Sequence, residues 1–234
     1  MKIVGTGLGA AFALAFWAIS PGHAAQQIGG AVSIQREVSG QVEGRSRSLA
    51  TGDDVHQNET IRTGSASSAE LGFLDQTRLA VGASAAVKLD RFVFEPDRGA
   101  RSVVLTATKG VARFVSGAGP SAVYQVRTPH ATIGVRGTVF EVMVQSSRTV
   151  VVLGDVGAVD VCRRAAPRTC QALTVPGDIA IVTATSLQGP RSAAAQSLDV
   201  AALRSALGGD TIALASAPAA PVRSRIWWFG KGPP

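Results

Sequence analysis

Residues 126–142 read VRTPHATIGVRGTVFEV, and this stretch decides how the rest of the chain is interpreted. It joins a turn dipeptide, Thr128-Pro129, to an extended apolar run that carries Arg136, and a Gly137-Thr138 break follows. Apolar residues then return at alternate positions, which is typical of a strand with one buried face. The stretch therefore predicts two strands joined by a turn, without any catalytic constellation.

The same period of two extends along most of the chain. Val32 and Ile34 alternate with smaller residues near the start, and residues 150–153 read VVVL, which predicts a fully buried strand. Gly, Asp, Ser and Pro interrupt these runs at roughly the spacing typical of all-β proteins. No helical pattern precedes Ser186. We therefore expect an all-β fold.

Internal repeats sharpen this expectation. Residues 49–55 (LATGDDV) are echoed by residues 173–179 (LTVPGDI), and residues 30–34 (GAVSI) are echoed by residues 157–161 (GAVDV). A shorter echo relates the IRTG run that begins at Ile61 to the VRTP run described above. Two related β units stacked face to face would bury the apolar side of each. We expect a compact β-roll or sandwich of two such units, followed by a short C-terminal helix and a flexible tail.

Several segments together resemble the FecR domain. Besides residues 126–142, the matching segments follow in family order at residues 49–55, 60–79, 89–96 and 110–117. The resemblance covers residues 28–182 and implies a periplasmic, all-β module known from regulators of iron-siderophore signalling and from other envelope proteins. It also implies action by protein–protein recognition through sheet edges and loops.

The chain departs from the family pattern in two ways. Gln76 stands where the family has the Gly of an Asp-Gly-Thr turn, so we expect a turn that needs no residue with positive φ. Signalling members also carry a cytoplasmic sigma-factor-binding segment and a membrane span before the domain, whereas a short apolar leader precedes it here. We therefore do not expect classical sigma-factor control by this chain alone.

The leader has the plan of a secretory signal peptide. Lys2 gives a basic start, residues 3–19 form an uncharged run of 17 residues, and small residues precede a cleavage site after Ala24. An uncleaved membrane anchor is the alternative, but the run is at the short limit for spanning a bilayer and ends in a helix breaker. We expect a signal peptide at 1–24, a FecR-like β domain at 25–185 and an Ala/Pro-rich C-terminal part at 186–234, in a protein that is periplasmic or exported.

Charge and composition restrict the partners. The 23 Lys and Arg against 16 Asp and Glu give +7, and removal of the leader leaves 22 − 16 = +6. The Arg residues are scattered along the chain, and an exported protein does not meet chromosomal DNA, so no nucleic-acid partner is expected. Few aromatic residues are present, which indicates a core of Val, Ile, Leu and Ala.

The two cysteines fit an oxidising compartment. Cys162 and Cys170 flank a polar loop between two short β-like runs, residues 159–162 and 171–175. Such a pair predicts a disulfide that staples a hairpin. A redox pair or a metal site is the alternative, but the spacing is not Cys-x-x-Cys and no His accompanies the pair.

The composition changes after Ser186. Residues 186–196 resemble a linker, residues 197–209 a short helix with a Ser cap and a Gly stop, and a further linker leads to the tail. Trp227, Trp228 and Phe229 lie there between basic residues. They are either a docking peptide for a partner groove or a membrane interface, or a last element that packs on its own domain. Any membrane contact is expected only through this tail.

Catalysis and metal binding find no support in the sequence. The histidines beyond the leader are His56 and His130, and neither has a second ligand at a suitable spacing; His130 is expected to face solvent. Acidic pairs such as Asp53 and Asp54 lie in turn-like sequence, where solvation explains them. We expect no cofactor and no enzymatic activity.

The signature residues Thr128, Pro129, Arg136, Gly137 and Thr138 are the candidate binding or structural set. Arg136 interrupts an apolar run, so it must reach solvent or be paired. It could bind a carboxylate of a partner. We favour the structural alternative, an internal pair with an acid such as Glu141 or Asp90, or with turn carbonyls, that pins the two β halves together.

The sequence thus predicts an exported, non-enzymatic protein that binds another envelope component, in a regulatory or scaffolding role. The alternative is a module that binds an envelope glycan or surface polymer. That function needs exposed aromatic platforms, for which Tyr124 and the three tail aromatics are the candidates. Oligomeric state and partner identity stay open.

Overall fold

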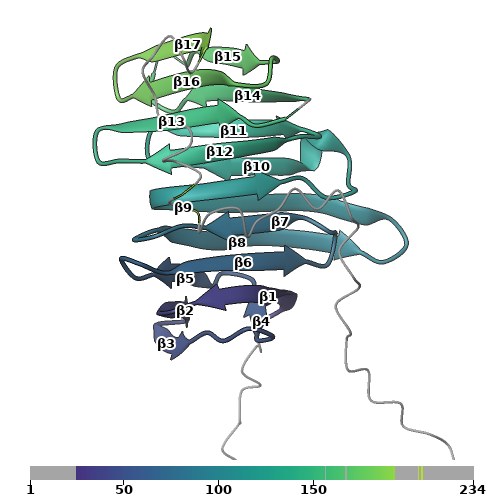
Figure 1. Ribbon diagram of the computed structural model, residues 1–234. Helices are drawn as coiled ribbons and strands as arrows, with labels where there is room; N and C mark the ends of the chain where they lie inside the picture. The colour runs from purple at the N-terminus through teal and green to yellow at the C-terminus, as the bar shows by residue number, and fades with distance from the viewer. Residues whose placement is uncertain (1–24, 156, 167, 193–204, 206, 208–234) are drawn as a thin grey trace, which may run out of the picture.

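Alternating apolar and polar residues form strands through almost all of the described chain (Figure 1). The computed structural model describes residues 25–155, 157–166, 168–192, 205 and 207. Its elements are β1 (Gln27–Gln35), β2 (Val38–Val42), β3 (Arg45–Ser48), β4 (Asp54–His56), β5 (Thr60–Thr63), β6 (Ser68–Phe73), β7 (Arg78–Val81), β8 (Ala86–Glu95), β9 (Gly99–Val115), the 3-10 turn η1 (Ser121–Val123), β10 (Tyr124–Arg127), β11 (Ala131–Arg136), β12 (Val139–Val144), β13 (Arg148–Leu153), β14 (Ala158–Arg163), β15 (Cys170–Leu173), β16 (Asp178–Thr183) and β17 (Leu187–Ser192). The predicted all-β class is confirmed.

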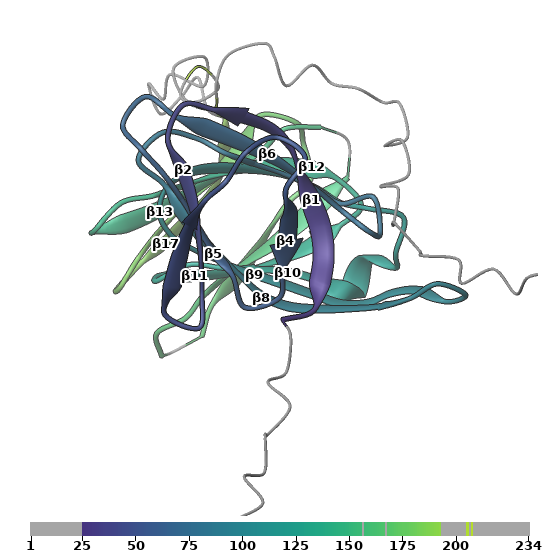
Figure 2. The same ribbon diagram turned by 90° about the horizontal axis from the view of Figure 1, so that it is seen from below.

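The strands form two layers that face each other across the core. Sheet A has the order β4-β1-β6-β7-β9-β12-β13-β16-β17. Sheet B has the order β3-β2-β5-β8-β9-β10-β11-β14-β15. Figure 2, which looks along the stack, shows the two curved layers around a common interior. Among the described strands every pairing is antiparallel except that of β9 with β10.

Strand β9 belongs to both sheets. Its first part pairs with β8 and β10 in sheet B, and its last residues pair with β7 and β12 in sheet A. The change of sheet falls at Gly110, whose φ is 82°. A Cβ atom there would lie 2.5 Å from the Cα of Ala85, so only glycine allows the strand to bend at this point.

The N-terminal unit comprises β1 to β8 and the C-terminal unit β10 to β17. The two units lie end to end along the stack, on either side of β9, and each contributes strands to both sheets. The Gly-Asp echo is confirmed in three dimensions. Gly52 and Gly177 have φ of 92° and 87°, and their amides donate to the carbonyls of Ala31 and Leu153, each at 2.8 Å. The structural counterpart of β1 is therefore β13. The sequence echo between residues 30–34 and 157–161 had indicated β14 instead, and that prediction is wrong.

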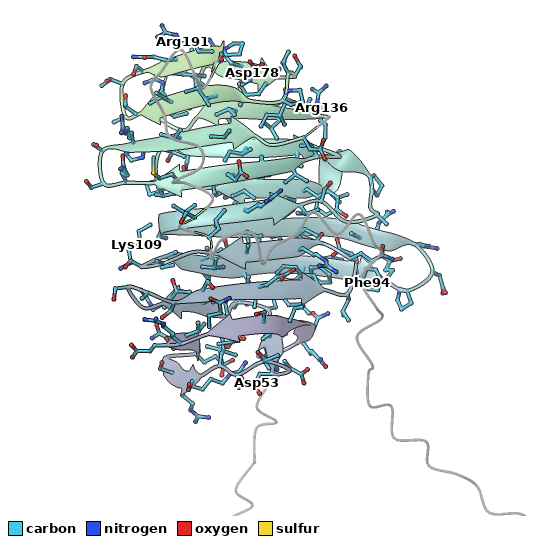
Figure 3. All side chains as sticks on the ribbon, in the orientation of Figure 1. Asp53, Phe94, Lys109, Arg136, Asp178 and Arg191 are labelled. Carbon is cyan, nitrogen blue, oxygen red and sulfur yellow. A yellow bond between two sulfur atoms is a disulfide. The ribbon has the colours of Figure 1, made fainter. Side chains whose placement is uncertain are left out.

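The turns that carry this echo use the same side-chain bonds. Asp53 Oδ2 accepts from the amide of Ala50 at 2.9 Å, and Asp178 Oδ2 accepts from the amide of Val175 at 3.2 Å. Figure 3 shows Asp53 and Asp178 at opposite ends of the stack. One local sequence thus builds the same corner twice, so the units are related in structure as well as in sequence.

The core between the sheets is mainly aliphatic, with two separate groups of aromatic contacts. Phe114 lies 5.4 Å from Phe140 and 6.0 Å from Tyr124 between ring centroids, and Phe73 lies 5.8 Å from Phe92. These rings come from both units. The group around Phe114 joins β9 to β10 and β12, and burial of these rings contributes roughly 25 cal/mol per Å² of apolar surface.

A buried carboxylate ties the β6–β7 turn to the start of β10. Asp75 Oδ2 accepts hydrogen bonds from Thr77 Oγ1 at 2.8 Å and from the Tyr124 hydroxyl at 3.0 Å. The amide of Gly119 donates to the Tyr124 oxygen at 2.9 Å. Because Asp75 is 4% exposed, these donors replace the water that its charge would otherwise need.

Two local predictions are wrong. Gln76 has φ of 71°, so the β6–β7 turn does require a left-handed residue, and Gln76 adopts that conformation where glycine would cost less. Val32 was expected on the buried face of β1, yet it is 48% exposed while Ala31 is 3% exposed. A register shift between Ala31 and Ser33 turns the side chains over.

The β domain also extends further than predicted. Strand β17, Leu187–Ser192, pairs with β16, so the sheet passes the expected boundary at residue 185 and occupies the start of the predicted linker. Within the predicted helix only Ser205, which is helical, and Leu207 are described. The signal peptide at 1–24 and the tail aromatics lie outside the described residues. The part of the chain that is described holds no helix with the length and hydrophobicity needed to cross a membrane.

The predicted disulfide is confirmed. Cys162 on β14 and Cys170 on β15 are register partners with Cα atoms 4.0 Å apart, and they are bonded to each other. The bond closes a short hairpin near the C-terminal end of sheet B.

Burial of Tyr124, with the negative charge of Asp75 beside it, raises the pKa of the phenol from 10.0 to about 12. Tyr124 is the only tyrosine of the chain, so tyrosinate absorbance reports it alone. The unfolded chain releases this proton first, so the free energy of unfolding should fall as the pH rises from 10 to about 12. Asp75→Asn should lower the absorbance midpoint, whereas Asp97→Asn on an exposed loop should not. A wild-type midpoint at the ordinary value would contradict the buried placement.

The double variant Cys162→Ser/Cys170→Ser should unfold about 2–3 kcal/mol more easily than the oxidised wild type, because the disulfide restricts the unfolded hairpin. Urea titration followed by circular dichroism measures this difference. A thiol reductant should lower the midpoint of the wild type and leave the variant unchanged. Equal midpoints for oxidised wild type and variant would show that the staple does not stabilise the fold.

Candidate binding face on sheet B

The signature stretch builds β10, β11 and the entry to β12. Thr128 and Pro129 form the β10–β11 turn in sheet B, and Gly137-Thr138 form the corner at which the chain passes from sheet B to sheet A. Gly137 has φ of 59°, which explains the glycine at this corner.

Two of the signature residues serve the fold. Thr128 is fully buried, and its Oγ1 accepts from the amide of Ala131 at 2.8 Å and lies 2.9 Å from Thr149 Oγ1. Thr138 Oγ1 donates to the carbonyl of Asp155 at 3.1 Å. Such side-chain bonds to nearby backbone fix turns. Pro129 is exposed and contributes only its ring to the turn.

Gly134, in the middle of β11, has no comparable structural reason to be glycine. Its φ is not in the left-handed region, and a Cβ atom would meet only Asp160 atoms at 3.9 and 4.0 Å, which is ordinary contact. Glycine inside a strand costs stability and often marks a place where another molecule approaches the backbone. Gly134 lines a hollow on the outer face of sheet B, the side turned away from the core, and its missing side chain deepens that hollow.

The hollow has a volume of about 400 Å³ and mixed lining. Its floor and walls come from β10, β11 and β14, together with the 3-10 turn η1. Register pairing places a row of residues across this outer face, from β8 to β14: Arg91, Val104, Gln125, Gly134 and Asp160. The hollow therefore sits within a broad surface that five strands build.

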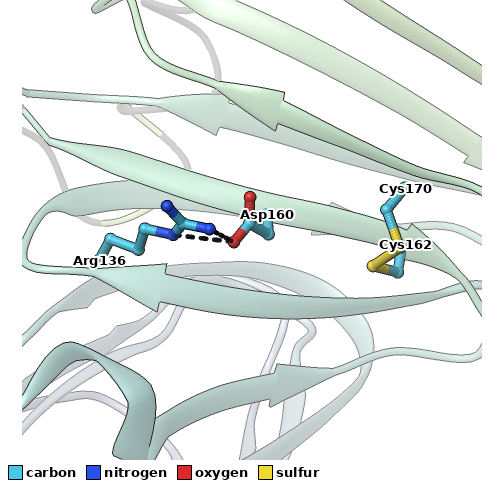
Figure 4. Close-up of a disulfide and its surroundings, with 4 residues drawn as sticks. All are labelled: Arg136, Asp160, Cys162 and Cys170. Atoms are coloured by element: carbon cyan, nitrogen blue, oxygen red, sulfur yellow. Dashed lines mark hydrogen bonds and ion pairs between the residues drawn. A yellow bond between two sulfur atoms is a disulfide. The ribbon is translucent and has the colours of Figure 1, made fainter.

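Arg136 forms the rim of the hollow. Its Nη2 and Nε lie 2.6 and 2.9 Å from the same oxygen, Oδ2 of Asp160 (Figure 4). The Arg136 side chain is 65% exposed, so its remaining donors face solvent. The partners expected from the sequence, Glu141 and Asp90, are wrong. Because β11 and β14 belong to the same unit, this pair does not pin the two halves together.

The other two acids have partners elsewhere. Glu141 faces Arg113 across the β9–β12 pair, with Nε and Oε1 3.9 Å apart. Asp90 bonds Thr106 and lies 3.0 Å from Lys88 Nζ. The sequence did not predict Asp160 as the partner of Arg136, because the two residues are far apart in sequence and meet only through the β11–β14 pairing.

The outer face of sheet B carries more positive than negative side chains around the hollow. Arg127 on β10 is exposed and donates from Nε to Gln125 Oε1 at 2.8 Å. Among the neighbouring charged residues, four are basic and two acidic, a balance of 4 − 2 = +2: Lys88, Arg91, Arg127 and Arg136 against Asp90 and Asp160. Such a face attracts acidic partners.

The disulfide supports this surface. Cys162 lies two residues after Asp160 on β14, so the two side chains share the outer face (Figure 4). By fastening β15 to β14, the disulfide holds the strand that carries Asp160. The site therefore combines an exposed cation with a strand that is covalently supported.

Other candidates do not gather here. Tyr124 touches the hollow but points its hydroxyl to Asp75 in the interior and is 2% exposed, so it offers no stacking platform. His130 is half-buried, with Nδ1 3.4 Å from Thr149 Oγ1, and the expectation that it faces solvent is only partly met. No group of three or more His, Cys, Asp or Glu residues in the described chain could hold a metal ion.

Sequence reasoning missed Gly134, Gln125 and Asp160. A signal was present for one of them, because a glycine between Ile133 and Val135 breaks an otherwise apolar strand. Gln125 and Asp160 carry no such signal, since their role depends on which strands become neighbours.

Comparison with known proteins agrees with the resemblance seen in the sequence. The family model described as FecR protein matches residues 59–157, which contain β5 to β13. A search of curated proteins finds no match. Arg136 and Gly134 lie within the matched residues, whereas Asp160 lies just beyond them.

Two solved structures are similar, each described as a "putative anti-sigma factor" from Parabacteroides distasonis ATCC 8503. Their TM-scores are 0.44 and 0.43, with sequence identities of 19% and 18%. Each match covers 58% of this chain and 62% of the solved chain, which is less than two thirds of its length. The FecR match thus covers residues 59–157, which the structure builds almost wholly from strands.

Proposed function

We propose that this protein is exported and acts in the cell envelope by binding an acidic segment of another envelope protein, without catalysing a reaction. The binding surface is the outer face of sheet B, centred on the hollow at Gly134. The FecR match over residues 59–157 supports a regulatory role, because the resemblance described above implies a family of envelope regulators.

Two features support export. The first 24 residues have the plan of a cleavable signal peptide. The disulfide between Cys162 and Cys170 requires an oxidising compartment to persist, and the described chain has no free cysteine. A periplasmic or extracellular location satisfies both.

The observation that carries the binding proposal is a glycine without a structural requirement beside an exposed arginine. Gly134 lowers the surface by one side chain, so a partner's chain can approach the sheet closely. Arg136 keeps guanidinium donors in solvent at the rim, where a carboxylate can accept from them. The excess of basic side chains nearby favours the approach of an acidic partner.

The glycan alternative has less support. Sugar binding generally uses exposed aromatic rings as platforms. In the described ranges, the exposed large hydrophobic residues are all aliphatic, namely Val32, Leu74, Val93 and Val175, and Tyr124 is buried. The remaining aromatic candidates are those of the tail, which lie outside the described residues.

Gly134→Val should weaken partner binding strongly and leave the fold intact. The valine side chain occupies the floor of the hollow beside β11. The backbone and the neighbours tolerate a side chain there, so the free energy of unfolding should change by less than about 1 kcal/mol. Captured envelope proteins should be compared by affinity purification from envelope extract, with affinity for each then measured using purified components. A loss of at least about tenfold is expected.

The matched control is Gly30→Val. Gly30 is also in mid-strand without positive φ, with only the Asp53 carbonyl 3.5 Å from a new Cβ, but it lies on β1 of sheet A. The Gly30→Val variant should bind the partner as the wild type does. Equal binding by Gly134→Val and the wild type would refute the proposed surface, and sedimentation of both with purified cell-wall polymer tests the glycan alternative in the same preparation.

Arg136→Ala should weaken the same interaction while lowering the free energy of unfolding by less than about 1 kcal/mol, because the ion pair with Asp160 is largely exposed. Wild-type binding should weaken as ionic strength rises, and the variant should show a smaller salt dependence. Thermal unfolding and a salt series of binding constants measure both. A strong loss of stability with unchanged affinity would instead assign Arg136 to the fold.

A further inference from the structure

The outer face of sheet A differs from that of sheet B because it is apolar. Side chains alternate between faces along each strand, so Val151 lies in the core between the sheets while Val150 and Val152 point outward. The outward residues form a separate cluster across four strands and beyond: Ala80, Val111, Val150, Val152, Ile179 and Leu207, with Met143 and Ile181 at its margin.

These outward residues are buried. Val150, Val152 and Ile179 are each 1% exposed, although they lie on the side of the sheet that is turned away from the core. The charged pair on the same face is also removed from solvent, since the side chains of Arg113 and Glu141 are 11% and 0% exposed. Something must therefore cover this part of sheet A.

Leu207 is the described residue that does so. It is 2% exposed and belongs to the same cluster, although it follows β17 by 207 − 192 = 15 residues and lies outside the residues matched by the FecR family. Ser205, two positions earlier, is exposed and helical. An exposed Ser205 followed by a buried Leu207 is the pattern expected of an amphipathic segment that packs on a sheet.

We propose that the outer face of sheet A is a docking surface for this chain's own C-terminal part, with Leu207 as its anchor. The surface is independent of the binding face on sheet B and does not rest on the proposed function. An uncovered apolar patch of this kind would promote association with other molecules, so its intramolecular occupant keeps the face closed.

Thiol reactivity of the full-length chain tests this placement. The described chain has no free cysteine, so Leu207→Cys and Ser205→Cys each introduce one reactive thiol. Cysteine is accepted in apolar sites. The thiol at position 207 should react with a maleimide at least about tenfold more slowly than the thiol at position 205, and denaturant should abolish the difference. Equal rates under native conditions would overturn the proposal.

A second pair of variants approaches the contact from the sheet. Met143→Cys places a thiol at the margin of the patch, and its reaction should accelerate by several-fold when Leu207→Asp is added, because the charged side chain cannot stay in the cluster. Leu74→Asp, at a leucine that is already 38% exposed, is the control and should leave the rate unchanged. Circular dichroism verifies that the strands persist. No acceleration with Leu207→Asp, in a folded protein, would show that another part of the molecule covers the face.

Discussion

The structure depends on the continuity of β9 through both sheets. One strand of 17 residues hydrogen-bonds with β8 and β10 on one layer and with β7 and β12 on the other. It can do so only because Gly110 lets the chain bend where a side chain would collide with Ala85. The N-terminal and C-terminal units are therefore parts of one hydrogen-bonded structure with one core, and neither has a complete pair of sheets without β9.

The residues of the signature stretch have two different roles. Some stabilise the turns, and others are exposed on the outer face of sheet B. The turns around β11 are fixed by side-chain hydrogen bonds of Thr128 and Thr138 and by the positive φ of Gly137. Those turns place Gly134 and Arg136 on an outward face with little local strain. The turn residues therefore make the motif recognisable in the sequence. The groups that it exposes to solvent belong to the neighbouring residues Gly134 and Arg136.

Much of the fold could be predicted because it depends on local patterns. The buried strand at 150–153, the hairpin disulfide and the two Gly-Asp corners follow from alternation and turn residues. The errors arose where tertiary contacts override such patterns. A bulge reverses β1 at Val32, and Asp75, held by the buried hydroxyl of Tyr124, fixes a turn in which Gln76 must be left-handed.

The candidate binding face on sheet B was less predictable for a geometric reason. Arg136 meets Asp160 across strands that are separated by β12 and β13 in sequence, and no local pattern specifies that neighbour. The hollow is likewise a property of three strands in register. The glycine that creates it was visible in the sequence, yet its meaning required the knowledge that a Cβ atom would fit there.

A stack of strands with two ends could in principle grow by adding further copies of itself. Each exposed margin of this molecule carries a feature that opposes such growth. On sheet A, β4 has only three residues, and β17 contains Pro190, which has no N–H to donate. On sheet B, β3 bears Arg45 and Arg47, and β15 is a four-residue strand tied to β14 by Cys170. The consequence is a stack of fixed length whose described edge strands are protected against end-to-end polymerisation.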